Sequence, residues 1–498
     1  MNYIDFHSHP SFKTYLSADN EQNRENCWED VDVTGIFELI DKLVGDILDS
    51  QCSLSQMDKG KVQIAVVGLY ALEKAMAKGS FLKNINISLI DIAKVLDELD
   101  QTLLSKIASG QYGYNDIYKQ VREHLLLSRD ISFGFKPISS ISEIDRDKLN
   151  IIFSLEGGHA LFNDVNNYTD DEVISNLEEI KSFSHRTLHL TLTHLSKCPL
   201  GTHAFGMKFI IDEDFYPEGF GISELGFKVI KKALKNGNNE KRILIDVKHM
   251  SLQSRLQYYK LLKEPEYSNV PIIASHCATT GVSMEKMPIK KIDNEDDKYV
   301  TVEYDDPKGL MDTEFNPWSI NLYDEEIPVI INSNGIIGII LDERVLGFRV
   351  DEEKSHEIFS KEEFEKYRET VTSNFNKYIN LDIIKKEEDE KIDVDDLKLI
   401  FNKRLRHLCN NILHIVKVGG EKAWKHICIG SDFDGMVDAV NCCKNSEKFK
   451  KLERKLCKML PKMAKTDPDT NYYINNVKDR VKSLMYGNAK RFLEENFN

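Results

Sequence analysis

The sequence predicts an α/β fold, a (β/α)8 TIM barrel that carries several insertions. Eight short apolar segments rich in β-branched residues are spaced along the 498 residues of the chain. Helical patterns lie between several of them, which is the alternation of strand and helix that builds a barrel. Histidine, glutamate and aspartate residues stand at the C-terminal ends of these segments, where barrels form their active sites.

The eight segments are nearly continuous apolar runs, as is typical of parallel strands buried on both faces. An open, doubly wound sheet is the alternative arrangement of the same elements. The predicted strands cover residues 3–9, 61–71, 149–158, 187–194, 242–251, 270–278, 335–342 and 426–435.

Two helices are predicted from amphipathic patterns and from the glycines that end them. One covers residues 223–236 and stops near Gly237, and the other covers 398–417 and stops at Gly419. The last segment, VKSLMYGNAKRFLEEN, predicts a closing helix.

Long segments between the strands are expected to be insertions into one barrel domain that spans residues 1–498. Residues 82–148 look largely helical, whereas 10–60 and 279–330 look like polar loops with short helices. Residues 351–397 are highly charged and are expected to be solvated. Residues 436–475 form a basic, lysine-rich segment. The insertions therefore cover about 10–60, 82–148, 279–330, 351–397 and 436–475.

The composition describes an acidic chain, in which 66 lysines and arginines against 81 aspartates and glutamates leave a formal net charge of −15. An acidic surface repels phosphate backbones, so nucleic acid is not an expected partner. No export signal is visible and no apolar run approaches roughly 18 residues, so no membrane contact is expected. Nine cysteines form no CxxC pair, which favours reduced thiols and a cytoplasmic location.

The strand ends carry the residue types that bind divalent metal ions. His7 and His9 alternate in the first predicted strand, so their side chains point to the same side. Histidine, glutamate and aspartate are ligands of zinc and similar ions, and a carboxylate can bridge two of them. Further candidates at later strand ends are Glu156, His159, His194, His249, His276, Asp432 and Asp434.

This residue set suits hydrolysis. Two ions about 3.5–4 Å apart can hold a hydroxide and clamp a carbonyl group. An aspartate beside the hydroxide can take its proton and pass it to a leaving amine. A further histidine can stabilise the oxyanion. The sequence therefore predicts a metal-dependent hydrolase.

The order and wording of six motifs resemble the membrane (renal) dipeptidase family of zinc peptidases, family M19, within the amidohydrolase superfamily. The final YGNAKRF also resembles the closing helix of that family. The motifs are the His-x-His of residues 7–9, SLEGGHAL at 154–161, LTLTHLSKCPLG at 190–201, GISELGFKVIKKAL with ILIDVKHMS at 221–251, IIASHCA at 272–278 and IGSDFDGM at 429–436.

The resemblance implies a TIM barrel of the metal-dependent hydrolase type with two Zn²⁺ ions per chain. His7 and His9 would hold the first ion, and Glu156 would bridge to the second. His249 and His276 would hold the second ion. The resemblance also implies a dipeptide as the substrate and a homodimer as the assembly.

The same resemblance implies the residues that act on the substrate. Asp432 would contact the metal-bridging hydroxide as acid and base, with Asp434 on the same face as the alternative. His194 would bind the scissile carbonyl or its oxyanion. His159 could instead orient Glu156 from behind.

Two departures separate this chain from the family pattern. The family usually has His-x-Asp in the first strand, so the neutral His9 here removes one negative charge and can change the metal preference. The family also places an arginine after the sixth strand to bind the terminal carboxylate of the substrate. No arginine stands there, and Lys286 and Arg344 are the candidate replacements.

These departures keep other functions open. One alternative is an amidohydrolase-type enzyme with the same metals that acts on another small substrate, such as a lactone, another amide or a phosphoester. The other is a metal-binding scaffold without catalysis, against which the presence of Asp432 with all the ligands argues.

Overall fold

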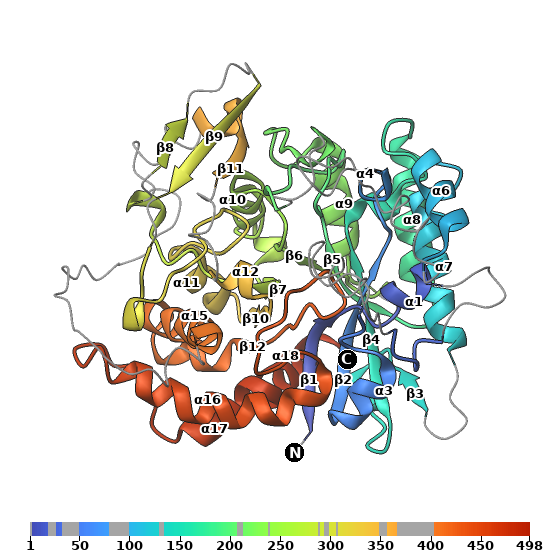
Figure 1. The fold of residues 1–498 in the computed structure, drawn as a ribbon. Coiled ribbons are helices and arrows are strands. Elements are labelled where there is room, and N and C mark those ends of the chain that lie inside the picture. The colour runs from blue at the N-terminus through green and yellow to red at the C-terminus, as the bar shows by residue number, and fades with distance from the viewer. Residues whose placement is uncertain are drawn as a thin grey trace.

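In the computed structural model of the chain, the eight predicted strands are all present and lie side by side around a barrel (Figure 1). The structure describes residues 2–17, 26–31, 49–78, 99–128, 134–206, 213–237, 240–286, 289–292, 298–304, 307–347, 356–365 and 403–498. The strands, in their order around the barrel, are β1 (Tyr3–Ser8), β2 (Val62–Tyr70), β4 (Leu149–Glu156), β5 (Thr187–Thr191), β6 (Leu244–Asp246), β7 (Ile273–Cys277), β10 (Ile336–Ile339) and β12 (Ile427–Ile429).

All pairings between these strands are parallel, and the two ends of the sheet meet. The residues after β12 lie beside β1, where Ser8 pairs with Phe433. The amide of Asp432 donates to the carbonyl of His7 at 2.9 Å, and the amide of His9 donates to Phe433 at 2.9 Å. The barrel prediction is therefore confirmed, and the open sheet is wrong. A short additional strand, β3 (Phe135–Pro137), pairs with β4 outside the barrel path.

Helices surround the barrel (Figure 1). The predicted helix at 223–236 is α9, which begins after Ser223, whose hydroxyl accepts from the amide of Gly226. The predicted helix at 398–417 is described from Lys403 onward as α15. The helices are α1 (Phe12–Leu16), α3 (Leu54–Lys59), α4 (Lys74–Lys78), α6 (Gln101–Ser109), α7 (Tyr114–Leu127), α8 (Asp170–Ser182), α9 (Glu224–Leu234), α10 (Leu252–Leu261), α11 (Glu326–Asn332), α12 (Glu343–Leu346), α15 (Lys403–Gly419), α16 (Phe449–Ala464), α17 (Val477–Lys482) and α18 (Asn488–Asn496).

Helices occupy the described parts of two predicted insertions, of which only 82–148 was expected to be helical. Within 82–148, α6 and α7 supply the expected helices, and within 436–475 the lysine-rich segment forms α16. The predicted closing helix is α18, preceded by a single π-helical turn at Ser483–Gly487.

A second sheet, formed by three antiparallel strands, corrects the prediction for two insertions. β8 (Ile289–Ile292) and β9 (Tyr299–Tyr304) lie in the segment that was expected to be loops. β11 (His356–Ser360) lies in the charged insertion, most of which falls outside the described residues. Buried and half-exposed side chains alternate along β9, which is the pattern of a strand with one face on a core. This sheet lies at the upper left of Figure 1, away from the barrel strands.

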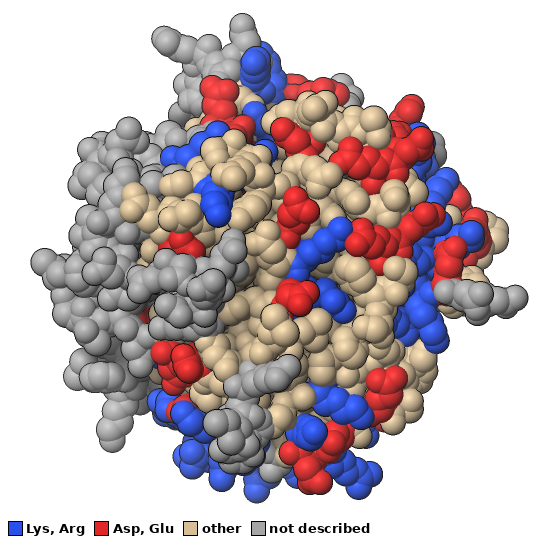
Figure 2. Space-filling view, turned by 90° about the vertical axis from the view of Figure 1, so that its right-hand side faces the viewer, with Lys and Arg blue, Asp and Glu red and all other residues tan. Residues whose placement is uncertain are grey.

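Three general properties of the chain are visible in the described residues. All nine cysteines are free thiols, as expected. Among the helices that the structure describes, none is long and apolar enough to cross a lipid bilayer. On the face shown in Figure 2, acidic and basic side chains are interspersed rather than separated by sign.

Candidate metal centre

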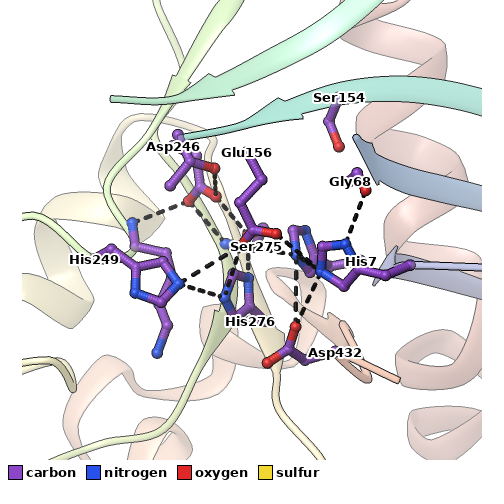
Figure 3. A network of polar contacts seen from close by, with 12 residues as sticks. His7, Gly68, Ser154, Glu156, Asp246, His249, Ser275, His276 and Asp432 are labelled. Carbon is purple, nitrogen blue, oxygen red and sulfur yellow. Dashed lines mark hydrogen bonds and ion pairs between the residues drawn. The ribbon is translucent and has the colours of Figure 1, made fainter. Parts of the chain in front are cut away.

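The six predicted metal ligands converge at the C-terminal ends of the barrel strands. Parallel strands of a barrel present these ends on one face, so residues far apart in the sequence meet there. His7 belongs to β1, His276 to β7 and Glu156 ends β4, whereas the others follow directly after a strand. Figure 3 shows His7 and His249 on opposite sides of Glu156. The converging residues are His7, His9, Glu156, His249, His276 and Asp432.

The Glu156 carboxylate is the centre of the cluster. Its Oε2 lies 2.9 Å from Nε2 of His9, and its Oε1 lies 3.3 Å from Nε2 of His7. On the other side, Oε1 lies 3.4 Å from Nε2 of His276 and 3.5 Å from Nε2 of His249. Both carboxylate oxygens therefore face imidazole nitrogens, which is the position that a bridging ligand needs.

The imidazole nitrogens also face one another in two pairs. Nε2 of His7 lies 3.1 Å from Nε2 of His9, and Nε2 of His249 lies 3.1 Å from Nε2 of His276. Unprotonated nitrogens this close repel through their lone pairs, and a cation between them removes the repulsion. The donor set of histidine nitrogens and carboxylate oxygens is that of zinc and related ions. The residues therefore fit divalent metal ions.

Two overlapping groups of residues could each hold an ion. Within each group, the ligand atoms lie within 4.8 Å of one another. Glu156 belongs to both. The first group combines His7, His276 and Asp432 with Glu156, and the second combines His194 and His249 with Glu156. His276 belongs to the first group, and its Nε2 also lies 3.1 Å from Nε2 of His249 in the second.

Hydrogen bonds behind the cluster fix which nitrogen faces it. Nδ1 of His9 donates to the Gly68 carbonyl at 2.8 Å, because a carbonyl can only accept. Nδ1 of His276 donates to the Ser275 hydroxyl at 2.7 Å, which itself donates to Asp246 at 2.5 Å. In both histidines the proton lies on Nδ1, so the free Nε2 lone pair points to the centre.

The backbone is in the left-handed region at two of these positions. His249 has φ 63° and Asp432 has φ 62°, and neither residue is glycine. This conformation is uncommon for residues with a side chain, and it persists where the surrounding structure holds it. Here it turns both side chains toward the cluster at points where a regular strand has ended.

The contacts of Asp432 and Asp434 distinguish the roles of these two aspartates. Oδ1 of Asp432 lies 3.3 Å from Nε2 of His9. Asp434 instead accepts from the amides of Gln51 at 2.7 Å and Cys52 at 3.0 Å, and it pairs with Lys13 at 3.2 Å. Asp434 therefore anchors the segment before α3 to the barrel, and Asp432 is the aspartate at the cluster.

His194 lies at the edge of the cluster and is held by a residue that the sequence analysis missed. Its Nδ1 donates to Oε1 of Glu73 at 2.8 Å, and its Nε2 lies 3.8 Å from Glu156. Burial opposes the charged form of His194, but the two carboxylates raise its pKa. Burial would also raise the pKa of Glu73, yet His194 lowers it. The signal for Glu73 was its position, two residues beyond the predicted second strand.

Two other candidates have hydrogen-bond partners away from the cluster, and the side chain of a third is not described. His159 donates from Nε2 to the Ala71 carbonyl at 2.7 Å rather than to Glu156, so its expected orienting role is wrong. Arg344 donates to Asp342 and to the carbonyl of Met436. Lys286 ends a short helical turn, and its side chain is outside the described residues.

Comparisons with known proteins found one matching family model and several similar folds. The model of the membrane dipeptidase family (peptidase family M19) matches residues 44–293 and 313–464. The crystal structure of "the dipeptidase AC", a family M19 metallopeptidase, is 14% identical, with 100% of this chain and 99% of that chain covered and a TM-score of 0.50. No curated protein matches by sequence.

Two further solved structures are similar at lower scores. One is the probable dipeptidase PvdM from Pseudomonas aeruginosa, with 16% identity, coverage of 100% and 96%, and a TM-score of 0.48. The other is a metallopeptidase from Rhodobacter sphaeroides with a phosphinate mimic of L-Ala-D-Ala, with 14% identity, coverage of 100% and 99%, and a TM-score of 0.49. The family model covers most of the chain, and the chain therefore belongs to the membrane dipeptidase family, peptidase family M19, whose members are metal-dependent dipeptidases.

Proposed function

We propose that this metal-dependent dipeptidase uses two zinc ions bridged by Glu156 to hydrolyse a small dipeptide. The observation that carries the proposal is the Glu156 carboxylate, which has a pair of histidine nitrogens on each side. His7, His9 and Asp432 would hold the first ion, and His249 and His276 the second. When bound, the two ions supply a water of lowered pKa and polarise the scissile carbonyl.

Asp432 is the proposed acid and base. Its carboxylate faces the first-strand histidines and keeps a small exposed area, with 14% of the side chain accessible. Burial raises the pKa of Asp432. A carboxyl group with a raised pKa accepts a proton from the attacking water more readily and can return it to the leaving amine.

His194 is the proposed partner of the carbonyl oxygen. Glu73 holds the imidazole by Nδ1, so Nε2 is directed toward Glu156, from which it lies 3.8 Å away. A proton on Nε2 would stabilise the negative charge that develops on the carbonyl oxygen during attack. Glu73 acts through His194 and is a positioning residue.

The function is tested with a panel of L,L- and L,D-dipeptides. Protein loaded with zinc should release amino acids from at least part of the panel, and the same protein treated with a chelator should not. Metal analysis of the loaded protein should give about two ions per chain, the number that a bridged pair requires. A loaded protein that cleaves no dipeptide would contradict the substrate assignment.

The proposal also covers three properties of the whole protein. A homodimer follows from the family resemblance, and the analytical test is sedimentation of the loaded protein. A cytoplasmic location is supported by the nine free cysteines, since oxidising compartments favour disulfides. The chain is proposed to be one barrel domain, with the segments between its strands as insertions.

A further inference from the structure

Asp246, the last residue of β6, has a fully buried carboxylate that is not one of the proposed metal ligands (Figure 3). Burying a carboxylate costs free energy unless a cation or hydrogen bonds compensate it. Within the described chain, no lysine or arginine forms an ion pair with Asp246. Nε2 of His189 lies 3.8 Å away, and burial lowers the pKa of His189 to about 4, so this imidazole is neutral at neutral pH. The carboxylate is therefore held by hydrogen bonds.

Four donors surround the Asp246 carboxylate, two on each oxygen. Oδ1 accepts from the backbone amides of Lys248 at 3.1 Å and Ser275 at 3.0 Å. Oδ2 accepts from the hydroxyls of Thr191 at 3.0 Å and Ser275 at 2.5 Å. Lys248 and Ser275 each directly precede a proposed ligand of the second ion. Oδ1 therefore fixes the backbone beside both of these ligands.

The Ser275 hydroxyl connects Asp246 to the imidazole of His276. Its oxygen lies 2.7 Å from Nδ1 of His276, while its proton is donated to Asp246. Because a carboxylate can only accept, the hydroxyl oxygen is left to accept the proton of Nδ1. An imidazole with its proton on Nδ1 has a free lone pair on Nε2, the atom that lies 3.4 Å from Glu156. The charge of one carboxylate thus sets the direction of both hydrogen bonds.

A similar pair, Asp5 and Ser431, joins β1 to the segment after β12. Asp5 accepts from the amide of Ser431 at 2.9 Å and from its hydroxyl at 2.6 Å, and both residues are fully buried. The other contacts of this hydroxyl are with backbone atoms, the amide of Phe433 at 3.1 Å and the carbonyl of His7 at 3.4 Å. Both pairs therefore join neighbouring strands, but the contact with an imidazole belongs to the pair that contains Asp246.

We propose that Asp246 is a positioning residue for the second metal ion, because its charge orients the Ser275 hydroxyl and thereby keeps the Nε2 lone pair of His276 available. The inference rests on the proposed role of His276 as a ligand and is independent of the substrate.

The substitution Asp246→Asn separates the charge of this side chain from its shape. The amide oxygen can still accept from both backbone amides in place of Oδ1. The NH2 group takes the place of Oδ2 and donates to the Ser275 oxygen, so the hydroxyl proton turns to Nδ1 of His276. The imidazole then carries its proton on Nε2, where it opposes metal binding.

The test is a zinc titration against a competing chelator, which gives the affinity of each ion without any dipeptide. Asp246→Asn should weaken one ion by about 10 to 100-fold, the range found for outer partners of ligating histidines, and His276→Gln should lose the same ion. Thr191→Val removes another donor to Oδ2 and should leave both affinities near those of the wild type. Asp5→Asn is the matched control, which should lower the free energy of unfolding without selectively weakening that ion.

A double substitution separates the orientation of the hydroxyl from a loss of structure. Asp246→Asn combined with Ser275→Ala leaves no hydroxyl proton to turn toward His276, so the second ion should bind no more weakly than in Ser275→Ala alone. A purely structural role would make the two losses add. If Asp246→Asn does not fold, Ser275→Ala is compared with Ser431→Ala, and Ser275→Ala alone should weaken the second ion.

Four results would overturn the proposal: an unchanged second-ion affinity in Asp246→Asn, an equal loss in Asp5→Asn, additive losses in the double variant, or equal losses in the two serine variants. Two ions bound as expected, with no dipeptide cleaved, would refute the proposed function and leave the role of Asp246 intact.

Discussion

The metal centre has two halves that are built alike and charged differently. Each half contains two histidines whose Nε2 atoms are 3.1 Å apart. The first half stands at the end of β1, and the second combines a residue after β6 with one in β7. In the first half, burial would lower the pKa of His9, but Glu156 and Asp432 raise it well above the ordinary value. In the second half, burial holds the pKa of His249 and His276 well below that value. The comparison teaches that, without metal, two neighbouring carboxylates favour the protonated form of His9 in the first half, whereas burial favours neutral imidazoles in the second.

The largest expected effect comes from removing the residue that both halves share. Glu156→Gln should abolish the bridge and lose metal from both positions. Activity should fall by about 10³-fold or more, because the metal pair supplies several kcal/mol of transition-state stabilisation. Metal analysis together with dipeptide hydrolysis measures both losses. If one ion remained firmly bound, the two halves would be independent sites.

The next effect separates proton transfer from metal binding in the first half. Asp432→Asn should keep both ions through the remaining ligands and lower kcat by about 10² to 10⁴-fold, the usual contribution of an acid–base group. Asp434→Asn is the matched control, because Asp434 bonds the amides of Gln51 and Cys52. The Asp434→Asn variant should mainly have a lower free energy of unfolding, with a smaller effect on kcat per folded molecule. Near-normal turnover of Asp432→Asn would refute the assignment.

Glu73 offers a smaller and more selective perturbation. Glu73→Gln should retain metal, since Glu73 contacts His194 and none of the six proposed ligands. Without the carboxylate, kcat should fall by about 10 to 100-fold, the range found when a supporting partner of a histidine is removed. The pH profile should also shift, because the Glu73 carboxylate raises the pKa of His194. Equal loss of metal and activity would show a structural role instead.

A substitution at Gly68 tests the first half of the metal centre without replacing a proposed metal ligand. A Cβ at this position would lie 2.6 Å from Cε1 of His9 and 3.1 Å from Cε1 of His7, so Gly68→Ala should displace both rings. Metal affinity should fall by about 10 to 100-fold. The counterpart in the second half is Ser275→Ala, which removes the acceptor of His276 Nδ1. Metal titration of both variants should show losses in different halves, and loss of the same ion in both would contradict the division.

The smallest effect is on the stability of the metal-free protein. Histidines with a lowered folded-state pKa, such as His249 and His276, destabilise the fold as pH falls below their unfolded value of 6.5. His9, with its raised pKa, contributes stability that is present below 6.5 and is lost as pH rises through its folded pKa. Urea unfolding of the chelated protein should therefore become less pH-dependent below pH 6.5 in His276→Gln, whereas His9→Gln should lose less stability than the wild type as the pH rises above 6.5.

The sequence predicted the barrel because parallel strands buried on both faces leave continuous apolar runs, and it predicted the cluster because the ligands end those runs. Glu73 was missed because it stands in a loop, and its importance arises from a contact with His194, 121 residues away. β9 and β11 were missed because their pairing joins segments far apart in the sequence. Local patterns carry no information about such contacts.

The closure of the barrel has a consequence for how the enzyme is made. Asp5 accepts from the amide and hydroxyl of Ser431, 426 residues away, and His7 and Asp432 are joined at the same seam. Contacts of such long sequence separation form late, because the loop between them must first be ordered. A ribosome-bound or clipped chain without residues 430–434 lacks both the seam and Asp432, the proposed acid and base, so turnover is expected only after the whole barrel has closed. Peptide-bond hydrolysis is thereby withheld until the protein is finished.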